Sequence, residues 1–254
     1  MSLKLLILFF TPLLSGLLIF LVPKGRNPNY KMLLVFAGSY LFAITVIHIL
    51  PELYRQSLGL EFIGMFVLLG FFLQQLLEYL TSGVEHGHVH GSKTGDSHPH
   101  HHGHPHSVSA IVLLVALCIH AFLEGGMLAE VSSSKPVYDV YAVLLGIVLH
   151  RAPAAFALMT VLAVQFRSRR KAIPYLFVFS LAAPIGLVLS SYLASAEALS
   201  STGLIYLYAL VSGNFLHIST TIVFESTPGH KFDARKMAIA VFGALVAVGV
   251  EYVI

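Results

Sequence analysis

Three side chains that could bind a metal ion lie within two long apolar segments of the chain. His120 and Glu124 are four residues apart, and His150 lies near the middle of the next apolar segment. On a helix, side chains four residues apart share one face, with Cβ atoms roughly 5–6 Å apart. If the two segments are packed helices, two imidazoles and one carboxylate meet at one depth, a ligand set that suits zinc with one position left open. The spacing therefore predicts a buried metal or proton site.

Two neighbours of His150 bear on this site. Arg151 places a charge in the middle of an apolar segment, which costs roughly 2.5–3.5 kcal/mol on insertion scales, so it needs a partner, and Glu124 is the candidate at that depth. A guanidinium cannot ligate a metal and repels a nearby cation. Pro153 frees the carbonyl of Leu149 one turn earlier. This kink could serve an ion path or simply pack against a neighbouring helix.

Two weaker pairs are possible accessory residues of the site. Asn214 and His217 are three residues apart in a later apolar segment and could add a ligand, a proton relay or an interhelical hydrogen bond. His48 and Glu52 flank Pro51 at the end of the second apolar segment, where they could form an ion entrance or a polar helix terminus. The alternatives stay open for each pair.

The elements that position these residues are membrane-spanning helices. Hydrophobic residues make up 57% of the chain, charged residues 11%, and the mean hydropathy is +0.83, whereas a soluble domain has roughly 25% charged residues. Spans of about 20 apolar residues must be helical, because a lipid-exposed backbone has to satisfy its own hydrogen bonds. We therefore predict an all-α integral membrane protein, one transmembrane domain over residues 1–254, with eight transmembrane helices: Leu3–Leu21, Met32–Leu50, Phe62–Leu80, Val108–Leu128, Val140–Phe166, Ile173–Ala194, Gly203–Phe224 and Met237–Ile254.

The distribution of Lys and Arg predicts how the helices are oriented. The first, third, fifth and seventh connections hold eleven of these residues, and the second, fourth and sixth hold only Arg55 and Lys135. By the positive-inside rule, the odd connections are cytoplasmic and both termini lie outside. We expect an integral protein of the cell (inner) membrane. The basic residues form no groove interleaved with aromatic side chains, so the charge gives no sign of nucleic-acid binding, and we expect no nucleic-acid partner.

One long connection, residues 81–107, is rich in histidine. Interspersed Gly, Ser and Pro predict a flexible segment, which the charge distribution places in the cytoplasm. Alternating His-x-His pairs could bind zinc or similar ions loosely, and a plain soluble linker is the alternative. The nine candidate metal contacts are His86, His88, His90, His98, His100, His101, His102, His104 and His106.

The motifs on the two central segments resemble those of the ZIP (Zrt/Irt-like) metal-ion transporters. Residues 120–125 read His-Ala-Phe-Leu-Glu-Gly, against the family pattern His-Asn/Ser-x-x-Glu/Asp-Gly. Residues 150–154 read His-Arg-Ala-Pro-Ala, against His-Glu-x-Pro-His/Glu. Residues 48–52 on the second span and 212–217 on the seventh span resemble the family's motifs more weakly. The resemblance covers the whole chain and implies a ZIP-like bundle, in a variant with Arg in the motif of the fifth span.

The resemblance implies a transport site between the fourth and fifth spans, opened alternately to either side as one group of helices slides against another, in a homodimer. His120, Glu124 and His150 carry over as the ligands of the primary site. Ala121, Arg151 and Ala154 replace residues that build or bridge a second metal site in two-metal members. We infer a one-metal version in which Arg151 supplies part of the charge of the second metal.

The function that these features favour is secondary transport of a divalent metal ion toward the cytoplasm. Zinc is the preferred ion, although Fe²⁺, Mn²⁺ and Cd²⁺ accept the same ligands. The sequence has no nucleotide-binding signature, and we expect no enzymatic activity. One alternative is an intramembrane zinc hydrolase with His120, His150 and His217 on zinc and Glu124 as general base, although His-Glu-x-x-His is missing. The other is a non-transporting metal sensor.

Overall fold

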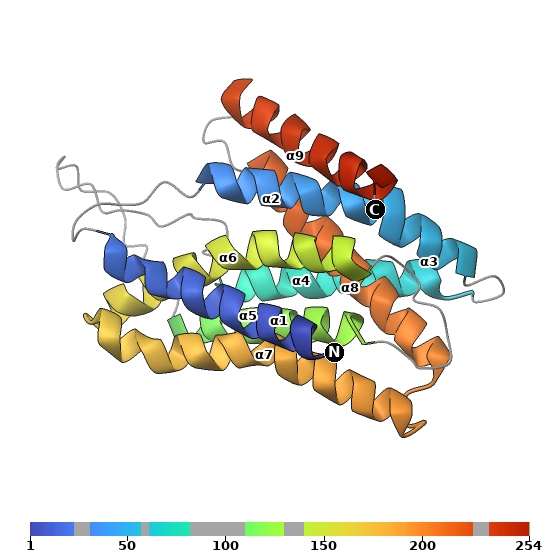
Figure 1. Ribbon diagram of the computed structural model, residues 1–254, viewed down its shortest axis with the longest axis horizontal. Coiled ribbons are helices and arrows are strands. Elements are labelled where there is room, and N and C mark those ends of the chain that lie inside the picture. Colours follow the sequence, from blue (N-terminus) through green and yellow to red (C-terminus); the bar gives the residue numbers. More distant parts are fainter. Residues whose placement is uncertain (23–30, 57–60, 82–109, 130–139, 226–233, 254) are drawn as a thin grey trace, which may run out of the picture.

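The computed structural model describes residues 1–22, 31–56, 61–81, 110–129, 140–225 and 234–253. Every regular element in these ranges is helical, and the long helices lie side by side along the molecule (Figure 1). Their bounds are α1 Ser2–Leu17, η1 Leu18–Leu21, α2 Lys31–Ile44, η2 Thr45–Ile49, α3 Leu50–Gln56, α4 Ile63–Thr81, α5 Ala110–Met127, α6 Val140–Gln165, α7 Arg169–Ser195, α8 Ser201–Glu225 and α9 Ala234–Val253.

The described helices form eight crossings of the molecule. The 3₁₀ turn η1 extends α1, while the π-helical turn η2 and α3 extend α2. Successive crossings run in opposite directions, and the two termini lie toward the same end (Figure 1). The predicted all-α class is confirmed, and the helix bounds agree with the predicted segments to within a few residues, apart from the α3 extension and the earlier start of α7.

Six of the eight crossings are long and apolar enough to span a membrane: Ser2–Leu21, Met32–Arg55, Ile63–Thr81, Ala110–Met127, Val140–Gln165 and Arg169–Ser195. The other two, α8 and α9, are 25 and 20 residues long. Helix α8 carries buried polar side chains such as Asn214 and His217, and α9 has charged residues near both of its ends. That these two helices also span the membrane stays a prediction.

The tight connection between α6 and α7 shows how the sequence ends one helix and begins the next. Arg167 adopts a left-handed conformation with φ of 50°. The Ser168 amide donates to the Ala163 carbonyl and the Arg167 amide to the Val164 carbonyl, which closes α6 in a Schellman motif. The Ser168 side chain then accepts from the Lys171 amide and caps α7. This cap explains why α7 begins at Arg169, four residues before the predicted start.

The helices divide into two groups by the way they pack. In the first helix group (α1, α5, α6 and α7), a Cβ added at Gly125 would clash with the Ala183 carbonyl, and one added at Gly186 with the Phe122 carbonyl. The backbones of α5 and α7 are therefore in direct contact, as small residues allow in membranes. In the second helix group (α2, α4, α8 and α9), Gly70 holds α4 against the Leu210 carbonyl of α8 in the same way.

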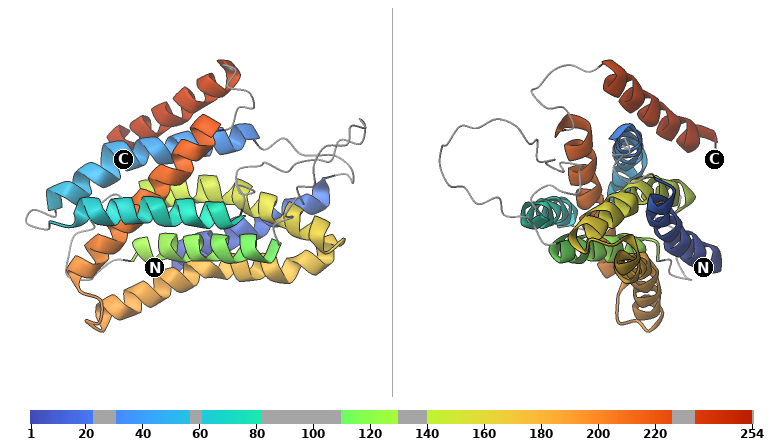
Figure 2. Two further views of the ribbon diagram at one scale, coloured as in Figure 1. Left: turned by 180° about the vertical axis from the view of Figure 1, so that it is seen from behind. Right: turned by 90° about the vertical axis from the view of Figure 1, so that its left-hand side faces the viewer.

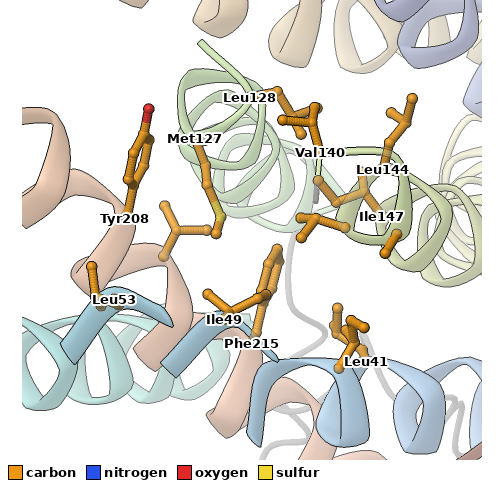
Figure 3. Packing of buried hydrophobic residues seen from close by; sticks show 14 of the residues in the cluster. Leu41, Ile49, Leu53, Met127, Leu128, Val140, Leu144, Ile147, Tyr208 and Phe215 are labelled. Carbon is orange, nitrogen blue, oxygen red and sulfur yellow. The ribbon is translucent and has the colours of Figure 1, made fainter. Parts of the chain in front are cut away.

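The two groups meet across larger apolar side chains. One buried cluster joins them (Figure 3) and includes Leu41 from α2, Ile147 from α6 and Phe215 from α8. A second cluster lies within the first helix group alone and contains Leu176 of α7. The helices within each group are in backbone contact, whereas the two groups touch through side chains. We infer that each group moves as a rigid body and that the interface between the groups deforms more easily. Seen end-on, α9 lies at the edge, against α2 (Figure 2).

Candidate metal centre

Helices α5 and α6 bring the three predicted ligands together in the interior. His120 and Glu124 lie on successive turns of α5, with 2.8 Å between His120 Nε2 and Glu124 Oε1. The same oxygen lies 2.6 Å from His150 Nε2, on α6. One ligand atom from each residue lies within 4.8 Å of the other two. Among the residues that the structure describes, this is the one such group of three or more His, Cys, Asp or Glu side chains.

The tautomer of His150 follows from its second ring nitrogen. His150 Nδ1 lies 2.9 Å from the Gly146 carbonyl oxygen, one turn earlier on α6. Because a carbonyl only accepts, Nδ1 donates to it, and Nε2 is the ring nitrogen that faces Glu124. This arrangement, in which a backbone carbonyl orients a metal-binding imidazole, is common in metal sites. No signal in the sequence could have identified this contact, because every helical residue has a carbonyl one turn earlier.

The contacts around Glu124 suit a shared cation. Glu124 is fully buried, and His120 and His150 are 5% and 4% exposed. Neither carboxylate oxygen of Glu124 makes a contact with hydrogen-bond geometry, and the same holds for Nε2 of both imidazoles. Two acceptors 2.6 Å apart repel each other unless a positive charge lies between them. The three side chains can therefore hold a cation or a proton in common.

Arg151 shares this pocket. Its side chain is 2% exposed, and its Nη1 lies 3.9 Å from Glu124 Oε2. The guanidinium carbon lies over the ring of Phe179 of α7, 5.1 Å from the centroid, a cation–π contact that helps to hold the charge in the interior. The sequence predicted Glu124 as the partner of Arg151 from their matching depth. It gave no signal for the contact between Arg151 and Phe179.

The structure places His217 against α4, away from the three converging side chains. His217 Nδ1 lies 3.4 Å from Glu78 Oε2, and its ring packs on Phe71 with 4.8 Å between centroids. Asn214 is fully buried, and neither of its amide atoms has a hydrogen-bond partner among the described residues. The connection between α8 and the site is Phe215, whose ring centroid lies 6.2 Å from that of His150.

The other predicted accessory residues lie at the end of the molecule where α3 ends. His48 Nδ1 lies 2.7 Å from Glu251 Oε1 of α9, and both side chains are half-buried. Glu52 Oε2 pairs with Arg55 Nη1 at 3.0 Å. Sequence reasoning had no signal for the contact between His48 and Glu251, because it joins residues from opposite ends of the chain. The nine histidines of the predicted cytoplasmic segment lie outside the described residues.

Comparison with known proteins decides the family. A model of the ZIP zinc transporters matches residues 2–251. The chain belongs to the ZIP zinc transporter family. The resemblance drawn from the two motifs is thereby confirmed, and the family is one of integral membrane transporters, which is consistent with the predicted absence of enzymatic activity.

Individual proteins similar to this chain are also zinc transporters by name, or share part of its sequence. Zinc transporter ZIP9 of Micropogonias undulatus is 31% identical over 174 residues, which cover 66% of this chain and 52% of that protein. Zinc transporter ZIP9-B of Xenopus laevis is 31% identical over 183 residues, covering 68% and 56%. Protein zntD of Dictyostelium discoideum is 30% identical over 134 residues, covering 52% and 19%. The chain spans about half the length of the ZIP9 relatives that it matches.

Proposed function

We propose that this ZIP chain is a secondary transporter of divalent metal ions, with zinc as its main substrate, and that His120, Glu124 and His150 are the ligands of the transported ion. The observation that carries the proposal is the buried group of three ligand atoms within 4.8 Å of one another on α5 and α6. Two imidazoles and one carboxylate bind zinc and leave a position for water. Fe²⁺, Mn²⁺ and Cd²⁺ are further candidate substrates.

The position of Glu124 favours transport over hydrolysis. An intramembrane zinc hydrolase built on His120, His150 and His217 would need three converging imidazoles, with Glu124 beside them as a base. Instead, Glu124 Oε1 contacts two imidazoles, as a ligand would, and His217 contacts Glu78. No observation favours a metal sensor without transport. The weaker candidates, for accessory roles beside the three proposed ligands, are Asn214, His217, His48 and Glu52.

Alternating access would use the two helix groups as its moving parts. The proposed ligands belong to the first helix group, while Phe215 of the second group covers His150 from the other side. Glycine-mediated backbone contacts make each group rigid, whereas Gly146 of α6 meets the side chains of Tyr40 and Leu41 of α2. Sliding along this side-chain interface would expose the site to each face in turn.

The proposed orientation of the protein in the membrane follows the topology predicted from its Lys and Arg residues. The basic connection from Arg167 to Lys171 lies on the cytoplasmic side, and the termini lie outside the cell (inner) membrane. The ion then moves toward the cytoplasm, where the histidine-rich segment 81–107 receives it. Residues 1–254 act as a single transport domain, and the family resemblance favours a homodimer.

Arg151 would stand in for a second metal. Its guanidinium lies 3.9 Å from the Glu124 oxygen that does not contact the imidazoles. A fixed positive charge at that point can balance the carboxylate while the first ion is absent. The chain would then carry one metal ion per cycle.

Metal flux into vesicles tests the proposal. Purified full-length protein is reconstituted into liposomes containing a zinc-sensitive dye, and zinc is added outside. We expect protein-dependent uptake in the wild type that is lost in the His120→Ala variant, and competition by Cd²⁺, Mn²⁺ and Fe²⁺ would rank the substrates. If zinc uptake were equal in protein-free and protein-containing vesicles, transport would be the wrong function.

A further inference from the structure

A cavity of about 800 Å³ that the proposed transport site does not use lies at one end of the bundle. It is formed where α1 begins, α7 ends and α8 begins, and these three helix ends lie on the side of the molecule marked by the N-terminus (Figure 1). None of the three proposed metal ligands lines it. Its volume lies in the range of small-molecule pockets, roughly 300–1,000 Å³, so it is large enough to hold a ligand.

The walls of this cavity carry side chains of both charges. Lys4 of α1 lines the cavity and is only 8% exposed, which is rare for a lysine. Glu197, in the connection from α7 to α8, lines it as well and adopts a left-handed conformation with φ of 57°. Ser191 of α7 and Ser201 of α8 add hydroxyl groups, which can donate and accept hydrogen bonds. A cation, an anion and hydroxyl groups around one space suit a zwitterionic ligand.

The depth of the cavity indicates where such a ligand comes from. The spans Ser2–Leu21 and Arg169–Ser195 are long and apolar enough to cross a membrane, and the cavity lies at the terminal turns of both, at the level of the lipid headgroups. Tyr192 borders the cavity and is 65% exposed, as is typical of tyrosine at a membrane surface. The apolar side chains of Leu3 and Val188 are exposed beside it. A ligand can therefore enter from the bilayer, with its apolar part against these side chains.

We propose that this cavity binds the headgroup of a phospholipid that carries a primary ammonium group, the chemistry of phosphatidylethanolamine. The phosphate accepts hydrogen bonds from Lys4 and from the Ser201 hydroxyl, and the ammonium group donates to Glu197. The acyl chains leave the cavity along Leu3 and Val188. By the predicted topology the lipid belongs to the outer leaflet. This inference goes beyond the proposed transport function and does not depend on it.

The two charges of the cavity distinguish between headgroups. Phosphatidylglycerol has the phosphate but no cation, so its negative charge would face Glu197 without compensation. Phosphatidylcholine has a cation without N–H groups, so it cannot donate a hydrogen bond to the carboxylate. We therefore expect phosphatidylethanolamine to bind more tightly than either of them.

Lipid binding to the purified full-length protein tests the proposal. Delipidated protein in detergent is titrated with each of the three phospholipids, and native mass spectrometry gives the fraction of chains that retain one lipid. Because a hydrogen bond to a charged group contributes about 1.5–3 kcal/mol, we expect Lys4→Gln and Glu197→Gln to weaken the binding of phosphatidylethanolamine by roughly 10- to 100-fold. The matched control is Lys171→Gln, which removes an exposed lysine at the other end of α7 and should leave binding unchanged.

Two further arms separate binding from folding and a lipid from a soluble ligand. Lys4→Arg keeps the positive charge and should retain binding, and Glu197 is exposed, so its substitution tests the site without disturbing the buried helix contacts. Soluble phosphoethanolamine, which lacks acyl chains, should compete weakly. Equal affinity for the three phospholipids, or unchanged binding in both Lys4→Gln and Glu197→Gln, would overturn the inference. Binding of phosphoethanolamine as tight as that of the lipid would assign the cavity to a soluble ligand instead.

Discussion

At the scale of single residues, the proposed site depends on the placement of one carboxylate. Glu124 Oε1 contacts both imidazoles, and Oε2 faces Arg151. The hydrogen bond from His150 Nδ1 to the Gly146 carbonyl directs the other ring nitrogen to the same point. The orientation of the His150 ring is therefore set by the turn before it.

The Glu124→Gln variant tests this residue. It keeps the size of the side chain but removes the negative charge that two imidazoles and a cation would share. Loss of an outer-shell partner lowers metal affinity about 10- to 100-fold, and we expect loss of the central ligand to exceed this. Zinc uptake in liposomes is the measurement, with Glu251→Gln, which removes a half-buried carboxylate outside the site, as the control. Uptake in Glu124→Gln at the wild-type level would remove Glu124 from the site.

The same substitution has a separate effect on stability. Removing one partner of a buried ion pair costs about 3–5 kcal/mol, because the other charge stays buried alone. In Glu124→Gln that charge is Arg151, so the double variant Glu124→Gln/Arg151→Gln should recover much of the lost thermal stability while remaining unable to transport zinc. Melting of the detergent-purified variants provides the measurement. A double variant less stable than either single variant would contradict an interaction between these two charges.

At the scale of helices, glycine positions decide how closely α5 and α7 approach. Gly125 and Gly186 both face a backbone carbonyl of the opposite helix. A methyl group at either position must push the helices apart, because a backbone cannot move aside as a flexible side chain does. Since His120 and Glu124 are on α5 and Phe179 is on α7, this contact also sets the distance between the site and the aromatic ring over Arg151.

We therefore predict that Gly186→Ala destabilises the protein by about 1–3 kcal/mol, the usual cost of overpacking, and lowers zinc uptake. The matched control is Gly249→Ala in α9, where an added Cβ would meet nothing within 4 Å. That variant should be as stable as the wild type or more so, because alanine favours helix over glycine. The measurement is the folded fraction after heating, by size-exclusion chromatography. Equal stability of the two variants would argue against a backbone contact between α5 and α7.

At the scale of the whole molecule, the proposed mechanism is a displacement between two helix groups. Each group is tied together by its own close contacts, and an apolar cluster of larger side chains joins them (Figure 3). Two buried hydrogen bonds also bridge the groups: the Tyr40 hydroxyl of α2 donates to the Ala142 carbonyl of α6, and the Tyr208 hydroxyl of α8 donates to the Ala129 carbonyl just after α5. A displacement of one group against the other must break or exchange these two bonds.

Cross-linking can test this displacement. In a Cys118→Ser background, Leu41→Cys and Gly146→Cys join α2 to α6 across the two groups, and we expect a bifunctional thiol reagent to block zinc uptake. Gly38→Cys and Ile222→Cys join α2 to α8 within the second group, where the added Cβ of Gly38 lies 3.0 Å from Ile222 Cβ. This control pair should leave most uptake intact. Full transport after complete cross-linking between the groups would exclude their relative movement.

The sequence by itself determined the membrane class, the approximate position of each long described helix and the three proposed ligands. These follow from local physics: length and hydropathy define a span, and a spacing of four residues places His120 and Glu124 on one face. The matching depth of His150 followed from its place in the next segment. The motifs around these residues also predicted the family, which the match over residues 2–251 confirmed.

Only the tertiary structure decided how the helices are rotated about their own axes and which of them are neighbours. Spacing on α8 could not tell that His217 faces Glu78 of α4 while Phe215 faces His150, because both lie at a depth where either could meet the site. Nor could it pair His48 with Glu251, from opposite ends of the chain. Such contacts depend on packing between helices, which is set by many side chains at once and leaves no local pattern in the sequence.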